Sequence, residues 1–129
     1  MPITDVPILS MLRTKMHWHQ DRQHLLAENV ANSDTPNFRP RELKELKFDG
    51  TGAPGAVTLA TTNPAHVATA GATPFQTVRA NLVETRPGGN GVNIEDEMLK
   101  VAQNQMDYQA VSALYTHSLS LIKTALGKR

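Results

Sequence analysis

The chain of 129 residues contains no cysteine. It therefore cannot form a disulfide, and neither thiol catalysis nor a cysteine-ligated zinc site is available to it. Aromatic residues are also scarce, with one Trp, two Tyr and three Phe. A chain of this length with so few large side chains fits one domain built around a thin helical seam and does not fit a thick globular core.

The chain also lacks a strong net charge and a long apolar run. The net charge is +1, and Lys and Arg are interspersed with Asp and Glu, so we expect no nucleic-acid partner. No apolar run approaches the ~20 residues that span a bilayer, so we expect no membrane span. The first residues, 1–5, lack the basic and apolar parts of a signal peptide, so export would need a route without a cleaved signal.

Three zones follow one another along the chain. Apolar periodicity predicts helices over about 7–32 and 93–126, and the zone between them is rich in Pro, Gly, Ala and Thr. Within that middle zone, 57–61 and 77–83 have strand character, while 48–55 and 86–91 are turn-forming. We expect a mainly α fold in which segments 1–32 and 92–129 pack as an antiparallel, coiled-coil-like helix pair. Segment 33–91 is expected to be loop-rich, with at most short β pieces.

The C-terminal helix has the clearest pattern. Asn93 is a suitable N-cap, and the acidic residues 95–97 suit the positive end of the helix dipole. Steps of four and three residues predict a seam along Ile94, Met98, Val101, Gln105, Tyr108, Ser112, Tyr115, Leu119, Ile122 and Leu126.

The N-terminal helix has a matching, weaker seam. It runs along Leu9, Leu12, Met16, His19, Gln23, Leu26 and Val30. In an antiparallel pair Gln23 would lie level with Gln105, and a buried contact between these amides would fix the register of the two helices.

Apolar residues also flank the C-terminal seam, so this helix should be buried on several sides. A compact bundle with a third helix would provide that cover, but the middle zone offers no good third helix. Neighbouring subunits are the favoured source of cover. The flanking residues are Leu99, Ala102, Met106, Val111, Ala113, Leu114 and Leu121.

Candidate chemistry is sparse. His17, His19 and His24 lack the i,i+3 or i,i+4 spacing of helical metal ligands, so we expect no metal and a solvated or interfacial role. The acids 95–97 are explained by the helix dipole, and no nucleophile–base set has triad spacing. We expect neither a cofactor nor an enzyme active site.

Residues 29–39, Asn-Val-Ala-Asn-Ser-Asp-Thr-Pro-Asn-Phe-Arg, resemble the Asn-Ile-Ala-Asn-x-x-Thr-Pro-Gly-Tyr-Lys signature of bacterial flagellar rod and hook axial proteins. Asn37 replaces the usual Gly, and Asn tolerates a left-handed turn. Residues 93–98 and 103–110 are similar to the proximal-rod branch of that family, with Gln103 in place of its Glu. Residues 59–67 are similar to a central piece of the same branch.

The resemblance implies a structural subunit that is exported unfolded by the flagellar type III system and assembles helically in the periplasmic rod. It implies as partners copies of the chain, other rod proteins, the rod-base adaptor, the basal-body ring and the export gate. A soluble helical regulator of the export apparatus remains the alternative, and a wall-cutting hydrolase would need a cleft with a buried acid.

The turn at 29–38 is expected to dock on a neighbouring subunit, whereas a simple helix stop would leave its asparagines in solvent. The expected assembly interface comprises Leu9, Leu12, Met16, Leu26, Asn29, Val30, Asn32, Thr35, Pro36, Phe38, Ile94, Met98, Val101, Gln105, Tyr108, Tyr115, Leu119, Ile122 and Leu126.

Overall fold

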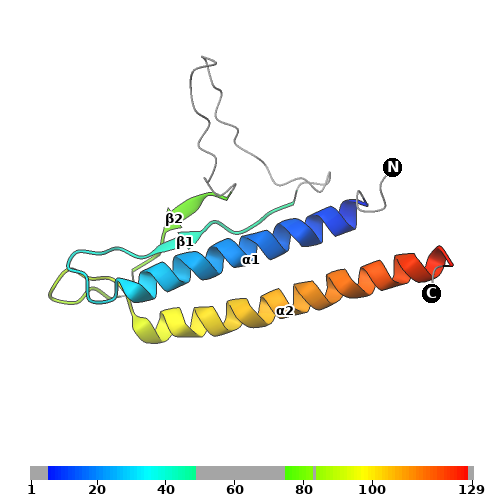
Figure 1. Cartoon of the computed structure of the whole chain (residues 1–129). Coiled ribbons are helices and arrows are strands. Elements are labelled where there is room, and N and C mark those ends of the chain that lie inside the picture. The colour runs from blue at the N-terminus through cyan, green and yellow to red at the C-terminus, as the bar shows by residue number, and fades with distance from the viewer. Residues whose placement is uncertain (1–5, 49–74, 83, 128–129) are drawn as a thin grey trace, which may run out of the picture.

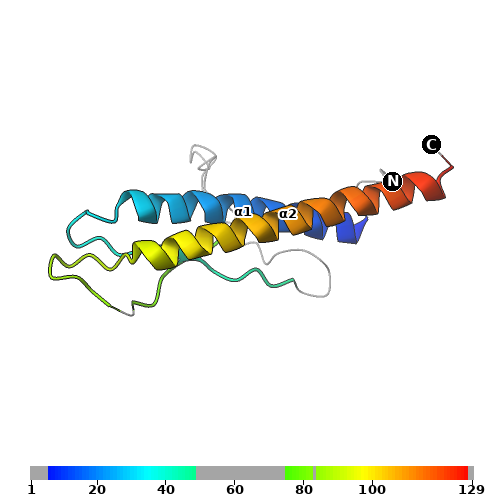
Figure 2. The same cartoon turned by 90° about the horizontal axis from the view of Figure 1, so that it is seen from below.

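Two long helices and a short strand pair make up the fold. The computed structural model describes residues 6–48, 75–82 and 84–127, with the elements α1 (Pro7–Ala31), β1 (Arg41–Leu43), β2 (Thr77–Arg79) and α2 (Ile94–Ala125) in chain order. The helices run side by side in opposite directions, and α1 lies between the strand pair and α2 (Figure 1; Figure 2). The predicted mainly α fold with an antiparallel helix pair is confirmed.

Local sequence explains where the helices begin and end. Pro7 starts α1, where its missing N–H costs no hydrogen bond, and the backbone N–H of Asn32 donates to the Glu28 carbonyl at the other end. The Asn93 side chain accepts a hydrogen bond from the backbone N–H of Glu95 at 3.1 Å, so the predicted N-cap of α2 is confirmed. Gly127 follows α2 with φ of 68°, a left-handed conformation that suits glycine.

The predicted seam of α1 is confirmed by burial. Four of its residues are buried and the other three are half-buried. A second line at helical spacing, Trp18, Arg22, Leu25 and Asn29, faces the extended chain. Three of these four side chains bond to residues 41–44, so α1 is the central layer of the molecule.

The predicted seam of α2 is wrong at three of its ten positions. Met98, Gln105 and Leu126 were expected to face α1, but all three are exposed, Met98 by 59% and Leu126 by 54%. The buried side chains of α2 are Glu97, Asn104 and Val111. The other seven residues of the predicted line are half-buried, namely Ile94, Val101, Tyr108, Ser112, Tyr115, Leu119 and Ile122.

The observed seam therefore starts at Ile94 and continues in steps of three and then four residues, whereas the prediction used steps of four and then three. At every second position, the buried residue (Glu97, Asn104 or Val111) lies one residue before the predicted one. Ser112 and Leu119 lie at its margin and are half-buried. The apolar pattern missed this line because Glu97 and Asn104 are polar, and each is buried through hydrogen bonds to α1. As a result, Met98 and its apolar neighbours lie outside the helix–helix contact.

The strand pair is antiparallel, with register Arg41↔Arg79, Glu42↔Val78 and Leu43↔Thr77. The backbone N–H of Ala80 donates to the Pro40 carbonyl at 3.1 Å, and that of Lys44 donates to the Gln76 carbonyl at 2.8 Å. The predicted strand at 77–83 is thus confirmed for its first three residues, while β1 was not anticipated. The expected strand at 57–61 and the motif at 59–67 lie outside the described residues.

Candidate assembly surface and its hinge

The turn that follows α1 is built around Asn29, which is 1% exposed. Its amide nitrogen donates to the Arg41 carbonyl at 2.8 Å and to the Glu97 carboxylate at 2.9 Å. Its amide oxygen accepts the backbone N–H of Arg41 at 3.1 Å. The backbone N–H and carbonyl of Arg41 point away from β2, and Asn29 bonds to both as a neighbouring strand would. Asn29 thereby connects α1, β1 and α2.

The next asparagine shapes the turn itself. Asn32 donates from its side chain to the Glu28 carbonyl at 2.8 Å and accepts from the Thr35 hydroxyl at 3.1 Å. Asn37 then adopts φ of 59°, as expected for the residue in place of the family's glycine. The Phe38 N–H donates to the Thr35 carbonyl at 3.3 Å, which completes the reversal into β1.

A third asparagine, Asn90, closes the turn from the other end of the chain. It is 5% exposed, and its amide nitrogen donates to the carbonyls of Asn32 at 2.9 Å and Thr35 at 2.7 Å. Its amide oxygen accepts the Val92 N–H at 2.8 Å. The sequence predicted only that residues 86–91 form a turn. The one signal available was an asparagine flanked by glycines directly before a capped helix.

Backbone contacts complete the joint between the two loops. The Asn37 N–H donates to the Gly88 carbonyl at 3.1 Å, and the Gly91 N–H donates to the Phe38 carbonyl at 3.0 Å. Gly89 has φ of 77°, and a Cβ there would collide with the Asn37 side chain. Residues 29–38 and 86–92 are thus one hydrogen-bonded unit, which we call the hinge.

A simple helix stop would leave Asn29 and Asn32 in solvent, and their burial excludes it. Asn29 is buried, Asn32 is half-buried, and the amides of both bond within the chain. Thr35 and Pro36 are exposed. Their docking on a neighbouring subunit stays a prediction.

A charged chain crosses all three layers beside the hinge. Arg22 on α1 pairs with Glu42 on β1 at 2.8 Å, and Lys100 on α2 pairs with Glu97 at 2.9 Å and with Glu42 at 3.6 Å. Burial lowers the pKa of Lys100, but its hydrogen bond to Glu97 and the charges of Glu97 and Glu42 outweigh burial, so the pKa lies above its ordinary value of 10.5. Glu97 is 3% exposed and therefore does more than complement the helix dipole, which corrects its predicted role.

A polar layer interrupts the helix seam one turn further along. The amide nitrogen of Asn104 donates to the His19 carbonyl and to the Gln23 side-chain oxygen, both at 2.9 Å. The predicted register is confirmed, because Gln23 lies level with this turn of α2, but its partner is Asn104 and the predicted Gln23–Gln105 contact is wrong. Gln105 is exposed on the neighbouring position.

The same layer determines which nitrogen of His19 carries hydrogen. Since the Asn104 nitrogen faces a carbonyl, its oxygen must face His19 Nδ1, 2.7 Å away, and Nδ1 must donate. His19 is 3% exposed, so its role is interfacial between the two helices, one of the two roles expected. The Nε2 atom is buried without a hydrogen-bond partner among the described residues.

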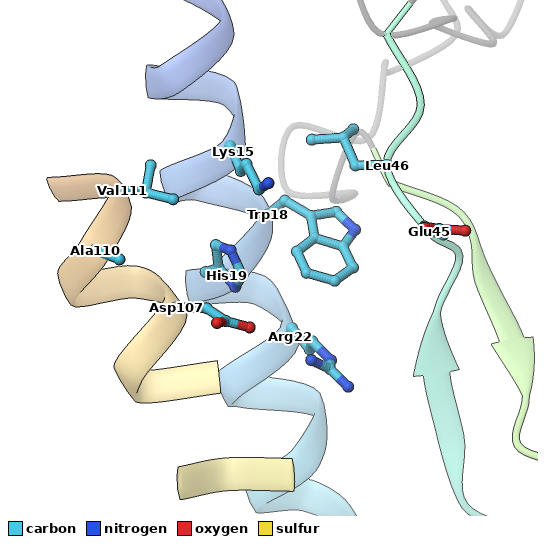
Figure 3. Close-up of a pocket in the computed structure, with 9 residues that line it drawn as sticks. All are labelled: Lys15, Trp18, His19, Arg22, Glu45, Leu46, Asp107, Ala110 and Val111. Carbon is cyan, nitrogen blue, oxygen red and sulfur yellow. The ribbon is translucent and has the colours of Figure 1, made fainter. Parts of the chain in front are cut away.

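A groove of about 380 Å³ lies between α1, α2 and the chain after β1 (Figure 3). Trp18 extends from α1 toward the extended segment, where its indole N–H donates to the Lys44 carbonyl at 3.0 Å. Arg22 lies 5.5 Å from the Trp18 ring. Lysine, arginine, aspartate and glutamate side chains line the groove together with apolar residues, so it favours no single ligand charge.

Catalytic chemistry has little support in this geometry. Glu97 is a buried acid beside a small groove, but its oxygens are taken by Asn29 and Lys100. Among the described residues no three potential metal ligands gather, and no described helix is long and apolar enough to cross a membrane.

Most of the large apolar side chains that are exposed in the described part of the chain lie on α2 or directly after it. They are Met98, Leu99, Met106, Leu114 and Leu121 on α2 and Leu126, its C-cap residue, each more than half exposed, at 59%, 69%, 64%, 51%, 58% and 54% respectively. No Asp, Glu, Lys or Arg occurs from Tyr108 to Ile122. We call these six side chains the outer stripe; apolar patches of this kind mark interaction surfaces.

The expected interface residues fall into three groups by burial. Buried are Leu9, Leu12, Leu26 and Asn29; half-buried are Met16, Val30, Asn32, Phe38, Ile94, Val101, Tyr108, Tyr115, Leu119 and Ile122; exposed are Thr35, Pro36, Met98, Gln105 and Leu126. The buried members act within the chain, so a neighbour can reach only the others and the rest of the outer stripe.

Several characterised proteins are similar to this chain, although no protein-family model matches it. The flagellar basal body rod protein FlgB of Escherichia coli is 33% identical over 102 residues, covering 72% of this chain and 74% of its own length. FlgB of Cereibacter sphaeroides is 31% identical over 108 residues, covering 83% and 84%. FlgB of Agrobacterium fabrum is 26% identical over 113 residues, covering 84% of each.

Proposed function

Because this chain belongs to the FlgB family of flagellar basal body rod proteins and is a structural subunit of that rod, we propose that it forms part of the proximal rod. In this proposal it has no catalytic role. It packs helically with copies of itself and with other rod proteins, between the rod-base adaptor and the next rod segment, inside the basal-body ring. Segments 1–32 and 92–129 form the axial core, and 33–91 forms the hinge and strand layer.

The observation that supports this proposal is the outer stripe of α2. A single chain leaves five large apolar side chains exposed on α2, and a sixth directly after it, and the second half of this helix is almost free of charge. Burying such a surface is favourable by roughly 25 cal/mol per Å² of apolar area. Contacts of this kind that do not close on themselves generate a helical filament, which is the form of a rod.

Export completes the proposal. The chain would leave the cytoplasm unfolded through the flagellar type III apparatus, past the export gate, and would fold where it assembles. The amphipathic architecture is consistent with this order, because the outer stripe becomes buried only in the assembly. Residues 35–38, at the tip of the hinge, would contact the neighbouring subunit.

Cryo-electron microscopy of isolated basal bodies tests the proposal. We expect density for this chain in the proximal rod, with α2 against helices of adjacent subunits. Basal bodies that lack the chain, or that hold it only at the export apparatus, would overturn the proposal and favour the regulator alternative.

A further inference from the structure

Asn90 and Gly91 lie in the hinge and form the one Asn-Gly pair in the chain. Asparagine is among the thermolabile residues, because the backbone nitrogen of the next residue can attack its side-chain Cγ and displace the amide. The attack is easiest when glycine follows, since glycine has no side chain to hinder the approach and its backbone is the most flexible. The sequence therefore places its most labile amide inside the hinge.

The fold requires both members of this pair. The Asn90 amide nitrogen donates to the carbonyls of Asn32 at 2.9 Å and Thr35 at 2.7 Å, which a carboxylate cannot do. A Cβ on Gly91 would collide with the side chain of Leu82. Two separate packing demands thus create the labile pair.

The closed hinge opposes the reaction in three ways. The backbone N–H of Gly91, which must lose its proton before it can attack, donates to the Phe38 carbonyl at 3.0 Å. Three hydrogen bonds hold the Asn90 side chain in place. Asn90 is also only 5% exposed, so water has little access to it. None of these restraints exists once the hinge opens.

We propose that Asn90 is a site of spontaneous deamidation in the unfolded chain, and that the closed hinge protects it. The Gly91 nitrogen gives its proton to water and bonds to Asn90 Cγ, the Cγ–Nδ2 bond breaks, and ammonia leaves with a proton taken from water. Water then opens the resulting imide at either of its carbonyl carbons, which produces aspartate or its β-linked isomer, isoaspartate. Overall, water is consumed and ammonia is released.

The products cannot close the hinge. In either product a carboxylate would face the carbonyls of Asn32 and Thr35 without a hydrogen to donate, in a buried site. Isoaspartate also lengthens the backbone by one carbon before Gly91 and so displaces its N–H from the Phe38 carbonyl. A chain that waits unfolded for export would accumulate this change and be excluded from the rod; this consequence rests on the proposed function.

Peptide mass spectrometry of the full-length chain tests the site. The purified chain is incubated at neutral pH in buffer and in guanidinium chloride, and fragment spectra locate each amide that has become an acid. We expect Asn90 to convert in guanidinium chloride and several-fold more slowly in buffer. Asn93 is the internal control, because it is exposed in the folded chain but is followed by Ile94, and it should change little in either solution.

Two results would overturn the proposal. Equal rates at Asn90 in buffer and in guanidinium chloride would show that the hinge does not protect it. An unchanged Asn90 in guanidinium chloride would show that it is not a deamidation site. Gly91→Ala checks the mechanism in guanidinium chloride, where the collision with Leu82 does not matter: it should slow conversion several-fold, whereas an equal rate would exclude attack by this backbone nitrogen.

A variant that carries the product tests the consequence. Asn90→Asp should lower the guanidinium midpoint and reduce incorporation into basal bodies several-fold. Asn93→Asp is the matched control, since aspartate caps a helix as well as asparagine does, and it should behave like the wild-type chain. A wild-type midpoint for Asn90→Asp would refute the effect on the hinge.

The two proposals can fail separately. Absence of the wild-type chain from the rod would refute the proposed function, while the rates at Asn90 and the midpoints are measured on the purified chain and do not depend on the rod.

Discussion

Three buried asparagines, Asn29, Asn90 and Asn104, use their side chains in the same way. Each amide nitrogen donates two hydrogen bonds and each amide oxygen accepts one. Each bridges parts of the chain that are distant in sequence. A carboxylate has the same shape but cannot donate a hydrogen bond, so we expect aspartate at these positions to destabilise the fold.

Asn29→Asp should be more damaging than Asn29→Ala. The new carboxylate would face Glu97 and the Arg41 carbonyl without a donor, and an unmatched buried charge costs about 2–4 kcal/mol. Urea unfolding monitored by circular dichroism measures the loss. Asn81→Asp, at an exposed position, is the control and should be nearly neutral.

Lys100 should make the free energy of unfolding depend on pH in the alkaline range. Its pKa in the folded chain is raised above 10.5, so its contribution is complete below that value and is lost as pH rises through the folded pKa. The urea midpoint of the wild-type chain should therefore fall at pH above about 10.5, beyond the fall seen in Lys100→Met. Parallel curves for the two proteins would contradict the proposed coupling to Glu97 and Glu42.

At the scale of elements, the helix pair is apolar at one end and is held by buried polar contacts at its centre and at the hinge. Leu9 and Leu12 are buried near one end, while His19, Gln23 and Asn104 meet in the middle. A polar layer of this kind stabilises less than an apolar one but penalises every register that leaves its amides unpaired.

Asn104→Leu should destabilise the helix pair by about 2–4 kcal/mol, because His19 Nδ1 and Gln23 lose their partner in a buried site. Adding His19→Leu should recover much of this loss. A double-mutant cycle by urea unfolding measures the coupling between the two residues. Strict additivity of the two substitutions would show that the polar layer is not a unit.

Ile122→Asp should abolish swimming. Ile122 is half-buried on the seam side of α2, and placing a carboxylate there costs several kcal/mol. Swarm diameter in soft agar and the amount of chain in basal bodies are the measurements. Ser120→Asp, two residues away and exposed, isolates the effect of burial, and normal swimming by Ile122→Asp would refute the seam at this end.

For the whole molecule, the central fact is the separation of two apolar surfaces. One is used within the chain, where α1 covers the seam of α2, and the other, the outer stripe, remains exposed. Their separation predicts that folding and assembly can be disrupted independently.

Leu114→Asp should leave the fold almost unchanged, within about 0.5 kcal/mol, because Leu114 is 51% exposed in the single chain. It should nevertheless block incorporation into the rod, since the charge would have to be buried between subunits. Fractionation of basal bodies measures incorporation. Leu114→Met keeps the apolar contact and should assemble normally; equal incorporation of both variants would remove the outer stripe from the interface.

The sequence by itself determined the helices, their ends, their antiparallel pairing and the seam of α1. These follow from local causes, namely apolar periodicity, the Asn93 cap and the turn residues after Asn32. The family could also be recognised from the sequence, because residues 29–39, 93–98 and 103–110 resemble its motifs.

Only the tertiary structure decided which side of α2 faces α1. Glu97 and Asn104 are polar, so no apolar pattern could place them inside, yet partners far away in sequence satisfy both side chains. The same cause hid β1 and the role of Asn90, whose bonds join loops more than fifty residues apart. A local sequence pattern shows which residues avoid water. The burial of a polar residue is explained only by hydrogen-bond partners that lie far away in the sequence and meet it in the folded chain.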